Sequence, residues 1–232
     1  MTVWYNLSKF ASTITNQALS TAIETLRTVF EGDAATRRKV SFSIAIIALS
    51  AKMAKADGVV TNDEVAAFRE IFEIPSGEAK HVARVFNLAK QDVAGFEAYA
   101  EKVRRLFPDD DDILRDVLDG LLHIAKADSV IHEEEMRFVE TVRGIFEIGN
   151  REFEAIKLRH VAPEEGHPYV VLGADPAWDD EALKAHHRKL VRETHPDRMV
   201  ARGVPEEFLR IANDRLSAIN IAWQHIRKER GL

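Results

Sequence analysis

The chain has 232 residues, of which 46% are hydrophobic and 30% charged, a composition typical of a globular protein with one large or two ordinary domains. It has no cysteine, which excludes disulfides, cysteine metal ligands and thiol catalysis, and its net charge of −6 argues against binding to a nucleic-acid backbone. The most apolar stretch, residues 40–51, is too short to span a bilayer, and the first ten residues lack the features of a secretory signal. We therefore expect a cytoplasmic protein with no membrane span and no nucleic-acid partner.

Apolar residues recur at helical spacing along almost the whole chain, which predicts an all-α fold. Residues 1–34 form a predicted N-terminal helical segment, whose exposed face would permit a homodimer. Residues 35–160 predict a helical bundle. The polar stretch at 161–167 contains proline and glycine and marks a linker, after which residues 168–232 form a second domain.

The predicted bundle contains an internal repeat. The sequence "AKADGVVTNDEVAAF" at 54–68 is similar to "AKADSVIHEEEMRFV" at 125–139. An apolar helix precedes each copy and an amphipathic helix follows it. Two helix–loop–helix units of this kind are predicted to pack together as one all-α bundle.

The repeat carries acidic residues that have two interpretations. In the first they cap helices, since Thr61 and Glu64 fit a capping box. In the second they bind a divalent cation, because hard cations prefer carboxylate ligands, although the spacing is not that of an EF-hand. We favour capping, under which no cofactor is required. The four candidate ligands are Asp57, Glu64, Asp128 and Glu135.

The pattern "KADGxVTxxE", present twice in a helical domain, resembles the TerB-like family, which is associated with tellurite resistance. The resemblance covers roughly residues 35–150. In that family the repeated acids are thought to form a metal-binding surface, which implies Asp57, Glu64, Asp128 and Glu135 here.

The second domain begins with a short apolar segment and a helix predicted from Asp180 to about Glu193, capped by Asp179. His187 lies beside the leucines of its apolar side. The helix must end near His195, because the residue before a proline is disfavoured in helical conformation. A second helix is predicted from residue 205 to about 228, with His-Pro-Asp in the loop between them. The opposite side of the first helix is basic: Lys184, Arg188, Lys189 and Arg192.

The His195-Pro196-Asp197 loop has competing interpretations. An acid/base pair of His195 and Asp197 would need a nucleophile, and none stands nearby in the sequence. A plain turn explains the proline and the aspartate, but it does not explain the row of basic residues that leads to them.

The stretch "YVVLGADPAWDDEALKAHHRKLVRETHPDRM" resembles the J-domain of DnaJ-type co-chaperones. The resemblance implies that the basic helix docks on a DnaK-type chaperone and that His195, Pro196 and Asp197 accelerate ATP hydrolysis by that partner. The chain itself would then be no enzyme. His187 replaces the family's usual tyrosine, which predicts weaker helix packing or docking. The implied docking cations are Lys184, Arg188, Lys189 and Arg192.

A TerB-like domain followed by a C-terminal J-domain is similar to the DjlA family of co-chaperones. The resemblance implies stimulation of a DnaK-type ATPase, with the first domain binding a client protein, a partner or a metal. The alternative is a metal-binding stress-response protein with a degenerate J-domain. Acidic residues outnumber basic ones in the first domain, so we also expect it to lie near the basic helix and partly occlude it.

Overall fold

The computed structural model describes residues 3–13, 34–56, 74, 77, 79–92, 95–126, 131–161 and 167–232. Every regular element in these ranges is a helix, which confirms the predicted all-α fold. No helix among them combines the length and apolar character that crossing a membrane requires. The predicted helix beyond residue 13 and most of the first repeat copy lie outside the described residues.

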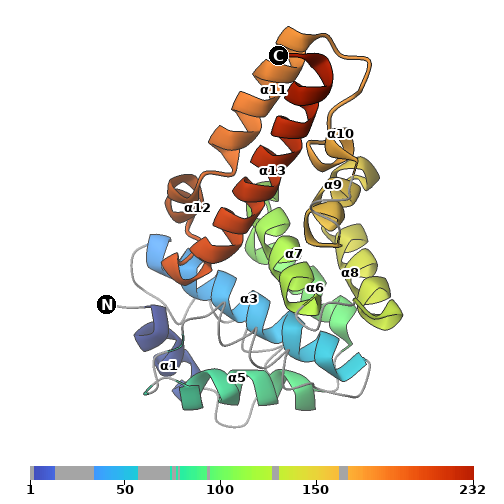
Figure 1. Ribbon diagram of the computed structural model, residues 1–232. Helices are drawn as coiled ribbons and strands as arrows, with labels where there is room; N and C mark the ends of the chain where they lie inside the picture. The colour runs from blue at the N-terminus through green and yellow to red at the C-terminus, as the bar shows by residue number, and fades with distance from the viewer. Residues whose placement is uncertain are drawn as a thin grey trace.

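The described part of the bundle contains seven helices, and α3 runs through its middle (Figure 1). The α3 residues from 40 to 54 are all buried, because this helix is apolar on nearly every side. In Figure 1, α1 and α5 lie below α3, and α7, α9 and the C-terminal helices lie above it. The helices are α1 (Val3–Thr13), α3 (Ala34–Ala56), α5 (Ala79–Gln91), α6 (Phe96–Leu106), α7 (Asp111–Ala125), α8 (Glu133–Ile145) and α9 (Asn150–Val161).

The C-terminal part is a helical hairpin that rises from the bundle (Figure 1). Its two long helices lie side by side, and α12 forms the corner between them. A 3-10 turn, Glu206–Phe208, leads into the last helix. The helices are α10 (Pro168–Val171), α11 (Asp180–Glu193), α12 (Pro196–Arg202) and α13 (Leu209–Arg230).

The last helix belongs to two hydrophobic cores. Ile219, Ala222 and Ile226 of α13 pack in a small core with residues of α10 and α11. The start of the same helix packs in the large core of the bundle. There, Gly120 of α7 leaves room for two neighbours, since an added Cβ would come within 3.0 Å of Ile46 of α3 and 3.6 Å of Ile211 of α13. The residues of α12 and α13, and of the turn between them, that join the large core are Met199, Val204, Phe208, Ile211 and Ala212.

The structure corrects one detail of the predicted hairpin. The sequence predicted a loop from His195 to residue 204, but a helix begins directly at Pro196. Proline is unfavourable inside a helix and favourable at its first position, where no N–H is needed. His195-Pro196-Asp197 therefore ends one helix and starts the next.

Candidate functional site

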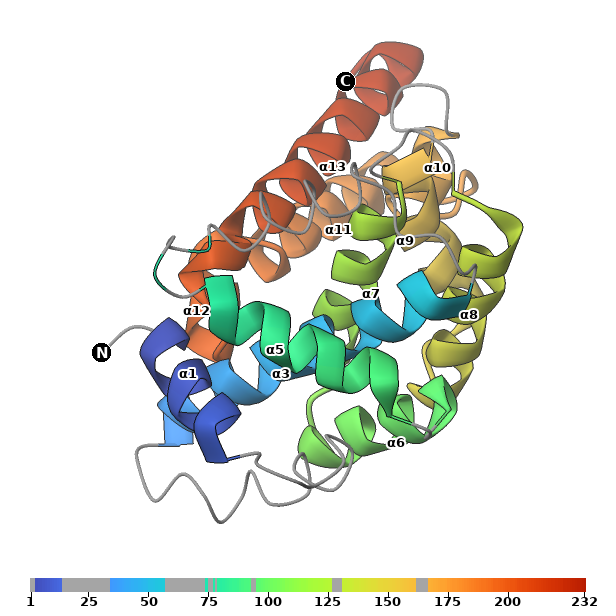
Figure 2. The ribbon, with the colours of Figure 1, turned by 90° about the horizontal axis from the view of Figure 1, so that it is seen from below.

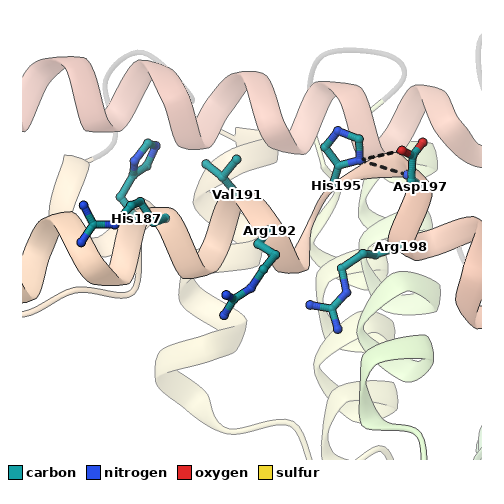
Figure 3. A pocket seen from close by; sticks show the side chains of 7 residues that line it. His187, Val191, Arg192, His195, Asp197 and Arg198 are labelled. Atoms are coloured by element: carbon teal, nitrogen blue, oxygen red, sulfur yellow. Dashed lines mark hydrogen bonds and ion pairs between the residues drawn. The ribbon is translucent and has the colours of Figure 1, made fainter.

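His195, Pro196 and Asp197 form an exposed corner between α11 and α12 (Figure 3). His195 is the N-cap of α12, and its Nδ1 accepts a hydrogen bond from the Asp197 backbone N–H at 3.2 Å. This leaves Nε2 to carry the proton of the neutral ring. The side chains of His195 and Asp197 are 49% and 91% exposed. The tripeptide is therefore held by its own capping contacts and remains open to a partner.

Three arginines lie beside this corner. Arg188 and Arg192 come from α11, and Arg198 follows the tripeptide on α12; Figure 3 shows Arg192 and Arg198 projecting side by side. None of the three makes an ion pair within the described part of the chain, and all are exposed. They line a shallow hollow with His187, Val191, His195 and Asp197.

The other two predicted docking cations lie differently. Lys184 is half-buried and pairs with Glu181 at 3.2 Å. Lys189 is 3.9 Å from Glu193 and lines a separate cleft between α11 and the bundle. Arg198 was not in the predicted set, although its position directly after the tripeptide could have indicated it.

His187 packs as an aromatic residue between the two helices of the hairpin. Its ring stacks on Trp223, with the centroids 4.7 Å apart and the planes at 12°, and its Nε2 lies 3.2 Å from Asn220 Oδ1. Burial lowers the pKa of His187, with the nearby His186 and Arg188 acting in the same direction. The ring thus makes a stacking contact at the position where the J-domain pattern that the sequence resembles has tyrosine.

A buried charge cluster joins the hairpin to α7. We call Asp116, Asp119, Arg202 and Arg215 the clamp cluster. Arg215 of α13 donates to Asp119 at 2.8 Å through Nε and to Asp116 at 2.9 Å through Nη1. Arg202 of α12 donates to the second oxygen of Asp116 at 2.9 Å. Both carboxylates have side chains that are only 1% exposed.

The clamp cluster satisfies charges that would otherwise be costly to bury. Burial alone would raise the pKa of Asp119, but Arg215 and His160 outweigh it and hold that pKa below its usual range. Burial alone would lower the pKa of Arg215, but Asp119 and Asp116 outweigh it and raise that pKa. Burial raises the pKa of Asp116, which its two arginines offset only in part. The cluster is a structural contact between helices rather than an acid/base site.

Within the described part of the bundle, two buried acidic groups face the hairpin without covering the predicted docking face. Asp116 and Asp119 pair with Arg202 and Arg215, which were not among the predicted docking cations. Arg192 remains exposed. Among the described residues, the expected occlusion of the basic helix is not seen at the corner, and Lys189 is the predicted docking cation that lines the cleft beside the bundle.

The candidate metal ligands are mostly outside the described residues, which include neither Asp57, Glu64 nor Asp128. Glu135 is 2% exposed, and its carboxylate accepts a hydrogen bond from the His132 N–H at 2.9 Å, as a helix-capping residue would. Across the ranges that the structure describes, no group of three histidine or acidic side chains could hold a metal ion.

Comparison with known proteins identifies the family of the bundle. The family described as Tellurite resistance protein TerB matches residues 43–158, which is half of the chain. The chain belongs to this family. The predicted TerB resemblance is thereby confirmed.

The similarity of this TerB family member to curated proteins covers more of the chain than the TerB match does. It is 27% identical to the "Co-chaperone protein DjlA" of Photobacterium profundum over 84% of the chain and 79% of that protein. The "Co-chaperone protein DjlA" of Aliivibrio fischeri is 24% identical over 87% of the chain and 83% of that protein. The protein of the same name from Coxiella burnetii is 23% identical over 78% of the chain and 74% of that protein. These matches confirm the predicted similarity to DjlA. No solved structure matches the chain.

Proposed function

We propose that this protein is a co-chaperone that stimulates ATP hydrolysis by a DnaK-type chaperone, and is not itself an enzyme. The observation that carries the proposal is the exposed His195-Pro196-Asp197 corner. Arg192 and Arg198 lie beside it and form no ion pair with any residue that the structure describes. The similarity to co-chaperones over most of the chain supports the same function.

The three arginines and the tripeptide would have different roles. Arg188, Arg192 and Arg198 would attract an acidic surface of the chaperone, and exposed charges of this kind mainly raise the association rate and fix the orientation of the partner. His195 and Asp197 would then contact the docked chaperone and change its rate of hydrolysis. The TerB bundle would add a client, a partner or a metal as the source of specificity.

The first experiment is single-turnover ATP hydrolysis by the host's DnaK-type chaperone, with the wild-type chain and with His195→Gln. Wild type should accelerate hydrolysis, and the variant should not, because glutamine cannot reproduce the imidazole contacts. Circular dichroism would show that the variant is folded. If the folded wild-type chain fails to accelerate hydrolysis, the co-chaperone proposal is wrong and a metal-binding role becomes the better hypothesis.

The docking role is tested by neutralising one cation. Arg192→Gln should raise the concentration needed for half-maximal stimulation several-fold, and high salt should shrink this difference because it screens exposed charges. Arg227→Gln is a matched control, since Arg227 is an exposed arginine near the far end of α13. An equal effect of both changes would mean that overall charge, rather than this face, governs binding.

A further inference from the structure

Arg202 connects both sides of the His-Pro-Asp corner to the bundle. It lies at the end of α12, and its Nη1 donates to the carbonyl of Glu193, the last residue of α11, at 3.2 Å. Its Nη2 donates to Asp116 of α7 at 2.9 Å. Its own carbonyl accepts a hydrogen bond from Arg38 Nε of α3 at 2.9 Å. One residue thus bridges the two helices of the corner and two helices of the bundle.

The bundle side of this connection is itself held in place. Asp116 is almost fully buried, and its other oxygen accepts from Arg215 at 2.9 Å. A carboxylate fixed by two guanidinium groups can hold Arg202 in one orientation, because bidentate and charge-assisted hydrogen bonds restrict geometry strongly.

The end of α12 also fits closely against α3, and Figure 2 shows the two helices together. Gly203 follows Arg202 with a φ of 95°, a conformation that favours glycine. A Cβ at this position would come within 2.8 Å of Arg38 Cβ. Met199 before this pair of residues and Val204 after it are both buried in the bundle core. One end of α12 is therefore anchored in the bundle while its other end carries the tripeptide.

We propose that Arg202 is a positioning residue: together with Asp116 it ties the His195-Pro196-Asp197 corner to the TerB bundle, so that the bundle sets the orientation of the corner toward the chaperone. The inference rests on the function proposed above. It gives the bundle a role in activation that is separate from binding a client or a metal. Neither Arg202 nor Asp116 lines the hollow that holds the docking arginines.

This placement predicts a specific kinetic signature for Arg202→Gln. Docking depends on the exposed arginines, so the half-maximal concentration should change by less than about twofold. Maximal stimulation should fall by about tenfold, the factor that corresponds to one charge-assisted hydrogen bond. Arg202→Lys keeps the charge near Asp116 but loses the forked geometry, and it should retain an intermediate stimulation. Arg227→Gln serves again as the control and should match wild type.

Hydrogen exchange of the free protein supplies a second measurement that needs no chaperone. The amides of residues 196–203 should exchange faster in Arg202→Gln than in wild type, while the amides of α8 stay unchanged. In a double variant with Asp116→Asn, stimulation should fall little further than in the more affected single variant, because both changes break the same connection.

Three results would overturn the proposal. One is that Arg202→Gln leaves both the maximal stimulation and the half-maximal concentration unchanged. Another is that Arg202→Gln raises the half-maximal concentration without lowering the maximal stimulation, which would make Arg202 a docking residue. The third is unchanged exchange at residues 196–203. If wild type itself gives no stimulation, the proposed function fails, and exchange alone then decides whether Arg202 ties the corner to the bundle.

Discussion

Replacing the buried Arg215 by methionine should strongly destabilise the protein. Methionine keeps much of the side-chain volume but removes the hydrogen bonds that Arg215 donates to Asp116 and Asp119. The two carboxylates would stay buried without their main positive partner. Removing one partner of a buried ion pair costs about 3–5 kcal/mol, so we expect the free energy of unfolding to fall by about 4 kcal/mol.

For a chain of this size, 1 kcal/mol corresponds to about 2–4 °C in Tm, so the transition should move down by about 8–16 °C. Urea and thermal unfolding followed by circular dichroism would measure both quantities. Arg137→Met is the control. Among the described residues, the ion pairs of Arg137 are with exposed Glu133 and Glu134 on α8, so this change should alter neither quantity measurably.

A combined variant tests the cause of the loss. If the cost arises from uncompensated buried charge, then Arg215→Met with Asp116→Asn and Asp119→Asn should be more stable than Arg215→Met alone. The reasoning is refuted if Arg215→Met costs less than about 1 kcal/mol, which is the range of an exposed pair. It is also refuted if neutralising both carboxylates recovers no stability.

Three further changes test other contacts by urea unfolding. Gly203→Ala should cost about 2 kcal/mol, because alanine is strained at the left-handed φ and its Cβ would meet Arg38; no loss would contradict this tight fit. Burial lowers the pKa of His123 to about 4 from 6.5, so the unfolded chain binds its proton first as the pH falls. The stability that the neutral His123 ring contributes is complete above pH 6.5, and the free energy of unfolding should decline by about 3 kcal/mol toward pH 4. His123→Gln should flatten this decline. An unchanged slope of stability against pH would contradict the assignment of the decline to His123. His187→Ala should cost about 1 kcal/mol through the lost stack on Trp223, whereas His187→Tyr should retain most of it; equal losses would show that the stack contributes nothing.

The sequence by itself determined the features that depend on near neighbours along the chain. Helical spacing of apolar residues predicted the all-α fold, and the basic side of α11 follows from four residues within nine positions. Asp179 accepts from the Ala182 N–H at 2.7 Å, as its place before the helix predicted. These features are local, because a helix forms its hydrogen bonds and its faces within a few residues.

Only the tertiary structure decided which side chains meet across the chain. Arg215 pairs with Asp116 and Asp119 almost a hundred positions away, and no local pattern distinguishes these charges from the many exposed ones. The same holds for α13, whose apolar side is continuous in sequence but is shared between two cores. The start of α12 at Pro196 could have been inferred from the proline, but the contacts of Arg202 and Gly203 with the bundle appear only in the tertiary structure. Long-range partners are selected by the burial of charge and by the space available when the helices pack, and helical periodicity carries neither kind of information.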